Sequence, residues 1–343
     1  MKTSRTTLFG AAVAALLLPA LVVPAAASAT PKNYHQPTVS VLASGLEGTL
    51  GGGIGPDGAL YVPEALAGEI TRVDLRTGRT STFATGLPKR VGDGGGIMDV
   101  AFVGRTAYAL VSLVDKDSFG GTSISGLYRI DDRDSSTVIA DIGKWSVDNP
   151  PDTDFFVLSG VHYALQPVHG GFLVSDGHHN RVLFVSHRGA ISEAMTFGNV
   201  VPTGLAVSGR TVYVSEAGPT PHNPADGKVV TFPLASHSPS VRTVASGYSL
   251  LVDVEFNRCG SLFALSQGDS AGNVPEGSPG ERNSGELLKV NRNGTLSVVA
   301  GTLDWPTSVD FVKNTAYVVT LTGTVVKIAN AVGKGDCRGH GHR

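Results

Sequence analysis

The sequence predicts an all-β protein: a six-bladed β-propeller closed by an N-terminal strand that completes the last blade. Three observations favour this fold. The 343 residues include 44 Gly and 19 Pro, and only 16% are charged. Short runs rich in Val, Thr and Tyr recur between Gly, Asn and Asp turns. After the first 29 residues no apolar period of 3.6 residues is sustained, so strands rather than helices are expected to form the core.

One unit recurs six times along the chain, beginning at Gly51, Ile97, Ser159, Pro202, Val252 and Pro306. Each unit has an apolar strand, a tight turn, a second strand rich in Tyr, Phe and Val, a loop, and then a third and a fourth strand joined by a polar turn. Turns such as Asp57-Gly58 and Asn293-Gly294 contain residues that tolerate positive φ, as short hairpins require. Four antiparallel strands repeated about an axis form the blades of a propeller.

The sixth unit stops after its third strand, near Ala331. A strand without a unit of its own, Thr38 to Ala43, precedes the first unit and is followed by Ser44-Gly45, as Val298 to Ala300 is followed by Gly301. We expect this strand to pair with the sixth unit. The pairing would close the ring and cover the strand edge that an open sheet leaves exposed.

The N-terminal segment of the chain predicts export. Residues 1–29 have a basic start, an apolar stretch from Leu8 to Val23 and a small-residue end, Ala27-Ser28-Ala29, as in a secretory signal. We therefore divide the chain into a signal peptide (1–29), the propeller (30–331) and a flexible C-terminal tail (332–343), and expect a secreted, extracellular monomer. Loss of the signal changes the formal net charge from −2 to −4 because Lys2 and Arg5 are removed.

No apolar run after the signal reaches the roughly 18 residues of a membrane span, and no basic stripe suggests nucleic acid. The two cysteines, Cys259 and Cys337, are expected to form a disulfide in an oxidising compartment. Neither their spacing nor their neighbours suggest a zinc site.

The stretch LVSDGHHNRVLFV, from Leu173 to Val185, places two histidines beside an aspartate. Such a trio suggests a metal or acid/base site. The aligned stretch of the first unit, Glu64 to Ile70, has no histidine, however. We therefore interpret the segment as a loop between two strands, with His178 and His179 on the surface, because metal-binding histidines usually come with further ligands.

Five carboxylates are candidates for ligand or cation binding. Glu64, Asp176 and Glu216 end second strands, and Asp99 and Asp253 lie at the start of first strands. In a propeller these termini meet around one mouth of the central channel, where crowded acids either acquire raised pKa values or recruit a divalent cation such as Ca²⁺. The alternative, which we favour, is that each acid caps a backbone amide or pairs with the adjacent blade.

Long loops are expected at the same mouth, where binding specificity tends to reside. They are Asp115–Ser125, Gly218–Asp226, Gly268–Ser284 and the connector Lys144–Asp154. Trp145 and Phe155 or Phe156 would supply an apolar wall. Their Gly, Ser, Asn and Pro content leaves open a second interpretation, that of solvated linkers.

With these repeats in view, the chain resembles the ScyD/ScyE family of secreted propeller proteins. The resemblance is carried by ASGLEGTLGGGIGPDGALYVPEA (43–65), VPTGLAVSGRTVYVSEAG (201–218) and VASGYSLLVDVEFNRCGSLFALSQ (244–267). LVSDGHHNRVLFV also resembles an NHL repeat. The resemblance implies the fold and export rather than a reaction. In the related gluconolactonase group, Asn or Asp before a Gly at strand starts holds a divalent metal; here Thr203, Thr307 and Ser159 occupy those positions.

Two functions remain. We favour a binding or scaffold protein that recognises a small molecule, glycan or protein at the loop-rich mouth. The alternative is an atypical metal-assisted hydrolase or lyase of the lactonase-like type, in which the five acids bind a metal or transfer protons. We assign no catalytic residue. HExxH and phosphate-binding GxxxxGK[ST] motifs are absent, and the stretch Gly268-Asp-Ser-Ala-Gly272, which resembles the nucleophile segment of serine proteases, lies in a Gly-rich inserted loop without a matching His or Asp context.

Overall fold

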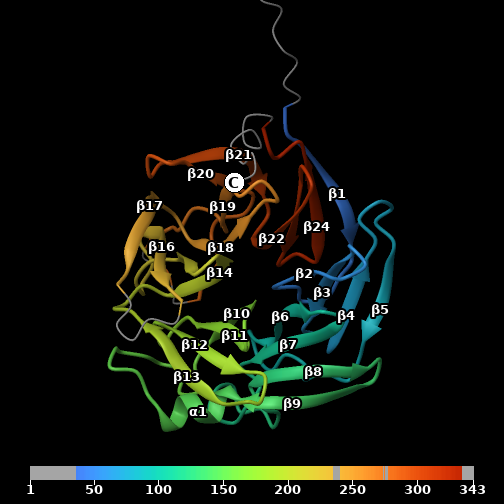
Figure 1. Cartoon of the computed structure of the whole chain (residues 1–343), viewed down its shortest axis with the longest axis vertical. Helices are drawn as coiled ribbons and strands as arrows, with labels where there is room; N and C mark the ends of the chain where they lie inside the picture. The colour runs from blue at the N-terminus through green and yellow to red at the C-terminus, as the bar shows by residue number, and fades with distance from the viewer. Residues whose placement is uncertain (1–35, 235–239, 273, 275–276, 334–343) are drawn as a thin grey trace, which may run out of the picture. The chain divides into compact units, whose positions relative to one another are not determined.

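Six antiparallel sheets of four strands each follow one another around a central channel (Figure 1). The computed structural model describes residues 36–234, 240–272, 274 and 277–333. The predicted six-bladed propeller is confirmed. The predicted signal peptide and residues 334–343 of the predicted tail lie outside the described residues, whereas Val332 is buried against the last blade.

The first five blades each use four consecutive strands. Blade 1 has β2 (Gly53–Ile54), β3 (Leu60–Glu64), β4 (Glu69–Val73) and β5 (Thr80–Ala84); blade 2 has β6 (Gly96–Val103), β7 (Thr106–Ser112), β8 (Gly126–Asp132) and β9 (Ser135–Asp141). Blade 3 has β10 (His162–Val168), β11 (Gly171–Asp176), β12 (Arg181–Ser186) and β13 (Ile191–Thr196); blade 4 has β14 (Pro202–Ser208), β15 (Thr211–Glu216), β16 (Gly227–Pro233) and β17 (Arg242–Tyr248). Blade 5 has β18 (Leu251–Phe256), β19 (Leu262–Ser266), β20 (Gly285–Val290) and β21 (Leu296–Leu303).

Blade 6 contains both ends of the described chain. Its strands are β22 (Pro306–Val312), β23 (Thr315–Thr320), β24 (Thr324–Ala329) and β1 (Thr38–Ser44), in the order β1-β24-β23-β22. β1 runs antiparallel to β24, from the Thr38–Ala329 pair to the Ser44–Thr324 pair, as the blue and red strands of Figure 1 show. The predicted closure by the N-terminal strand is therefore confirmed.

Burial explains the composition of each strand. Every residue of β11 (GFLVSD) is buried, because blades pack on both faces of a second strand. The outermost strands, such as β9 (SSTVIAD), are exposed or half-buried at nearly every position and carry polar residues. This gradient from channel to rim is why the second strands read as apolar runs in the sequence.

Five innermost strands have a register irregularity near their start, at Ile97/Asp99, His162/Leu165, Pro202/Leu205, Leu251/Asp253 and Pro306/Ser308. A bulge leaves one residue unpaired and redirects its side chain. Met98, Tyr163, Thr203, Val252 and Thr307 occupy these irregular positions and line the channel.

A short helix that the sequence analysis did not predict, α1 (Ile142–Asp148), joins blades 2 and 3. Asp141 caps it by accepting a hydrogen bond from the Lys144 amide at 2.9 Å. Seven residues are too few to show an apolar period, which explains why the sequence did not predict this helix. Within the described part of the chain, no helix has the length and apolar character needed to cross a membrane.

Cys259 lies in the turn between β18 and β19, and the described residues contain no free cysteine. Cys337 lies outside them, so the disulfide between the two stays a prediction.

Removal of β1 is expected to weaken the ring without changing the other five blades. A chain beginning at Gly45 loses six cross-strand residue pairs with β24. At about 1 kcal/mol per backbone hydrogen bond, reduced because the strand is largely exposed, the loss is about 4 kcal/mol, or about 10 °C in Tm. Thermal unfolding followed by circular dichroism measures this, with a chain beginning at Gln36 as the control. Equal Tm values would show that β1 does not close the ring.

Candidate ligand-binding site

Two cavities lie along the innermost strands. The first, here called the mouth cavity, has a volume of about 630 Å³ and is lined by the starts of innermost strands and by the loops around them. The second, here called the acid chamber, has a volume of about 220 Å³ and is lined by residues from β2, β6, β10, β14, β18 and β22. Both therefore depend on the arrangement of all the blades around the channel.

The mouth cavity has largely apolar walls. Its apolar and aromatic lining residues include Leu50, Met98, Leu113, Phe119, Phe156, Val201, Leu250, Val252, Trp305 and Leu321. Three of the loops expected at this mouth contribute to it, through Phe119, His222 and Pro279. Of the residues expected in the apolar wall, Phe156 lines the cavity, whereas Phe155 packs against His179. Trp145 instead lies 5.0 Å from the Arg181 guanidinium.

The acid chamber contains two of the five predicted carboxylates, in equivalent settings. Asp99 of blade 2 accepts hydrogen bonds from the Val100 amide and, at 2.8 Å, from the Leu165 amide of blade 3. Asp253 of blade 5 does the same with Val254 and, at 2.7 Å, with Val309 of blade 6. Each aspartate therefore joins its blade to the next. This is the backbone-capping arrangement that we favoured from the sequence.

Glycine is required beside each of these aspartates. A Cβ atom on Gly51 would lie 2.4 Å from Oδ1 of Asp99, and one on Gly204 would lie 2.3 Å from Oδ1 of Asp253. The same three groups, a glycine, an aspartate and a backbone amide, thus lie in contact once across blades 1 to 3 and again across blades 4 to 6.

Two further acids in the chamber, Glu255 and Asp310, were missed by sequence reasoning. Glu255 follows Asp253 by two residues, so both lie on the same side of β18. Asp310 occupies the position in β22 that Glu255 has in β18, because each pairs with the residue three before the end of the second strand. This two-residue spacing was the signal available in the sequence.

Burial raises the pKa values of the chamber acids. The pKa of Asp253 rises to about 7, and that of Asp310 rises to about 8, with the charge of Asp253 adding to the effect of burial. Burial, followed by the nearby Asp310 and Asp253, raises the pKa of Glu255 well above its usual range. The chamber thus holds protons at neutral pH.

The other three predicted acids line neither cavity, so the structure does not bring the five together. Glu64 accepts a hydrogen bond from the Glu47 amide at 2.7 Å and another from the Thr71 hydroxyl. Burial raises the pKa of Glu216 to about 7, against the influence of the Lys228 ammonium 3.8 Å away. No group of three or more His, Cys, Asp or Glu side chains within the described ranges is arranged to hold a metal ion.

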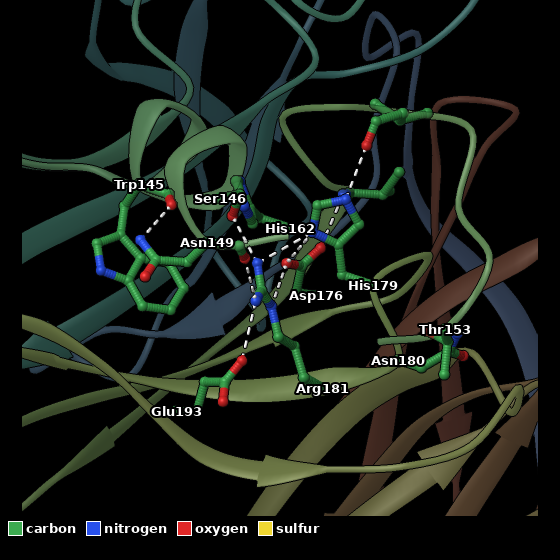
Figure 2. Close-up of polar contacts among 12 residues, drawn as sticks. Trp145, Ser146, Asn149, Thr153, His162, Asp176, His179, Asn180, Arg181 and Glu193 are labelled. Atoms are coloured by element: carbon green, nitrogen blue, oxygen red, sulfur yellow. Dashed lines mark hydrogen bonds and ion pairs between the residues drawn. The ribbon is translucent and has the colours of Figure 1, made fainter. Parts of the chain in front are cut away.

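Asp176 belongs to a buried network centred on Arg181 (Figure 2). Arg181 Nε donates to Asp176 at 3.0 Å, and His179 Nδ1 lies 3.2 Å from the same carboxylate oxygen. The Arg181, Asp176 and His179 side chains are fully buried. Burial alone would raise the pKa of Asp176, but its contact with His179 and the nearby charge of Arg181 lower that pKa below its usual range, so Asp176 is ionised.

The remaining donors of Arg181 hold the connector that follows blade 2. They reach Ser146 Oγ of α1 at 3.1 Å, the Asn149 carbonyl at 2.8 Å and Glu193 at 3.0 Å. His179 Nε2 is bonded to the Val157 carbonyl at 2.8 Å. The network thereby fixes the segment that carries Phe156 into the mouth cavity.

The expectation that both histidines are surface residues is wrong. His179 is 1% exposed because α1 and the connector cover it. His178 is partly buried, packs its ring against Phe156 with centroids 4.3 Å apart, and lines the mouth cavity. Burial, with His222 nearby, lowers the pKa of His178 to about 4, so it is a neutral imidazole at pH 7.

His222 provides an unused hydrogen-bond acceptor. It lines the mouth cavity, and its Nδ1 is buried without a partner. Burial lowers its pKa, and its ring bonds to the backbone of Gly218 and Pro219. A neutral imidazole that donates from Nε2 presents Nδ1 as an acceptor.

The hydroxyls at the three positions where related lactonases carry metal ligands are used differently. Thr203 donates to the Leu251 carbonyl of blade 5 at 2.8 Å, and Thr307 donates to the Leu50 carbonyl beside blade 1. Ser159 is buried, and its hydroxyl has no partner among the described residues. Two of the three therefore serve contacts between blades.

Comparison with known proteins supports the fold. No known protein family and no curated protein matches the sequence. A gluconolactonase from Xanthomonas campestris is similar in structure, with a TM-score of 0.60, 11% identity, and coverage of 86% of this chain and 90% of that chain. Virginiamycin B lyase from Staphylococcus aureus has a TM-score of 0.52, 11% identity, and coverage of 86% and 99%. A chain of a nidogen/laminin complex has a TM-score of 0.53, 15% identity, and coverage of 80% and 91%. At these identities the similarity shows the propeller fold alone.

Positions 178 and 181, three residues apart, are expected to respond differently to alanine. Arg181→Ala leaves Asp176 buried without its cation and should cost about 3–5 kcal/mol of unfolding free energy. His178→Ala, which removes a partly buried cavity wall, should cost no more than about 1 kcal/mol. Urea denaturation of both variants measures the difference. A loss below about 1 kcal/mol for Arg181→Ala would contradict the role given to the network.

The chamber acids should make the protein more stable at pH 5 than at pH 8. Their pKa values are raised in the folded state, so as pH increases from about 4 to 8 the unfolded chain ionises first and folding loses free energy. Asp310→Asn should raise the unfolding free energy at pH 8 by about 1–3 kcal/mol, well below the full linkage value, and flatten this dependence. Denaturation at both pH values, with exposed Asp134→Asn as control, measures it. A loss of stability at pH 8 would mean that the charged carboxylate is needed.

Proposed function

We propose that this protein binds a small, uncharged and largely apolar molecule in the mouth cavity. The observation that carries the proposal is the cavity itself. Its volume of about 630 Å³ lies in the range of small-molecule sites, and its walls are mainly aliphatic and aromatic with a few polar groups.

The polar groups of the mouth cavity suit a ligand without charge. His178 and His222 are neutral at pH 7 because burial lowers their pKa values. Arg90 donates to the backbone carbonyls of Gly92 and Asp93, so its guanidinium is already engaged. The free Nδ1 acceptor of His222 calls for a ligand that carries a hydroxyl or an N–H group.

The proposal includes a secreted, extracellular and monomeric protein of the ScyD/ScyE type. The signal-like residues 1–29 and the quoted sequence resemblance support it. A small-molecule ligand is favoured over a glycan or a protein because the cavity is concave and lined by apolar side chains from several loops.

A probe of apolar sites tests this function. Nile red, an uncharged dye, should bind with one saturable site and an increase in emission. Phe156→Ala should weaken binding about tenfold, because an aromatic wall residue contributes about 1 kcal/mol or more. Leu158→Ala is the matched control, since Leu158 is similarly exposed, at 52% against 56% for Phe156, and does not line the cavity.

The two tryptophans provide a second readout. Trp305 lines the mouth cavity, whereas Trp145 packs on Arg181. Ligands should therefore alter the emission of Trp145→Phe, which keeps Trp305, and leave that of Trp305→Phe unchanged. Absence of dye binding to the parent protein, or equal binding to Phe156→Ala, would reject the proposed site.

The second candidate is a metal-assisted hydrolase or lyase, favoured by the four carboxyls around the acid chamber. Calorimetric titration with CaCl₂ separates it from the first. Heat of Ca²⁺ binding that is lost in Asp253→Asn and Asp310→Asn, together with activity on a lactone or ester panel, would support it. The proposal of a binding protein expects neither.

A further inference from the structure

The side chain of Tyr163 crosses the central channel. Tyr163 belongs to β10 of blade 3, and its hydroxyl donates to the Thr307 carbonyl of β22 in blade 6 at 3.2 Å. Blades 3 and 6 are three positions apart in a ring of six, so they face each other across the channel (Figure 1). The phenol ring therefore spans the channel rather than packing within its own blade.

Tyr163 lies at the boundary between the two cavities. Among the described residues that line them, it alone lines both. The innermost strands of blades 2 and 5 pass from one cavity to the other at the same point: Met98 and Val252 line the mouth cavity, and the next residues, Asp99 and Asp253, line the acid chamber. The two cavities are thus one residue apart along the strands, with the tyrosine ring between them.

The two sides of the ring offer opposite chemistry to a ligand. On the mouth side the walls are mostly apolar, and His178 and His222 are neutral. The charged lining residues there are Arg90, which is hydrogen-bonded to backbone carbonyls, and Asp93, which is exposed. On the other side, Glu255 and Asp310 lie near each other, and the buried hydroxyl of Ser308, only 8% exposed, has no partner. A buried carboxylate attracts a cationic group strongly because it is poorly solvated. At pH 8 Asp253, whose pKa is about 7, is mainly ionised.

We propose that Tyr163 is the specificity-determining residue of the site: it forms the floor of the mouth cavity, limits the length of the ligand and keeps cationic groups away from the acid chamber. This inference rests on the proposed function. It follows that removing the ring joins the two cavities and turns a site for neutral apolar molecules into one that also accepts an apolar chain ending in an ammonium group.

The test compares 1-decanol with decylammonium chloride at pH 8 by isothermal calorimetry. The parent should bind the alcohol and discriminate against the ammonium ion. Tyr163→Phe, which loses the hydrogen bond to Thr307 but keeps the ring, should retain this preference. Tyr163→Ala should shift the ratio of the two affinities toward decylammonium by about tenfold or more, the effect of one added charge pair. Adding Asp310→Asn to Tyr163→Ala should remove much of that gain.

Controls separate the possible failures. Tyr213→Ala removes a tyrosine that packs edge-to-face on Phe256 and lines neither cavity, and it should leave the ratio unchanged. Tyr163→Leu keeps an apolar side chain should the alanine variant not fold, and near-ultraviolet circular dichroism checks each variant. If the parent binds neither 1-decanol nor Nile red, the proposed function fails. If the parent binds but folded Tyr163→Ala and Tyr163→Leu keep its preference, the role of Tyr163 is rejected.

Discussion

Contact between blades 6 and 1 is the constraint on which the rest of the structure depends. At the outer rim β1 pairs with β24, and at the channel Thr307 donates to the Leu50 carbonyl while Asp310 accepts from the Ile54 amide. Both cavities are lined by blades on each side of this junction. An open ring would separate those walls, so a ligand site of this shape exists only in the closed molecule.

The same segment serves stability and recognition. The Asp176–Arg181 pair is enclosed by α1 and the connector. The residues that directly follow the connector place Phe156 against His178 at the cavity wall. Buried ion pairs are poor contributors to net stability but strongly constrain the groups around them. The network therefore explains how a long loop with little regular structure can present a defined apolar surface.

The fold could be predicted because its unit repeats along the sequence. The site was harder to predict because it depends on contacts between residues that are far apart in the sequence. The six repeated units predicted six blades, and the additional strand Thr38–Ala43 predicted how the ring closes. Both predictions are confirmed. The channel position of Asp99 and Asp253 followed from their place in the repeat. By contrast, the burial of His179 depends on a connector from a neighbouring blade, and Trp145 packs on Arg181 rather than in the cavity. Neither contact has a periodic signal in the sequence.

The contacts of Asp99 and Asp253 give the two halves of the ring the same framework, related by a half-turn about the channel. Tyr163 and Thr307 occupy corresponding irregular positions in that framework and face each other. Two side chains long enough to reach the axis from opposite directions would overlap there. Only one of these two positions can therefore carry a bulky residue, and the side chains at the axis must depart from the twofold symmetry of the framework around them.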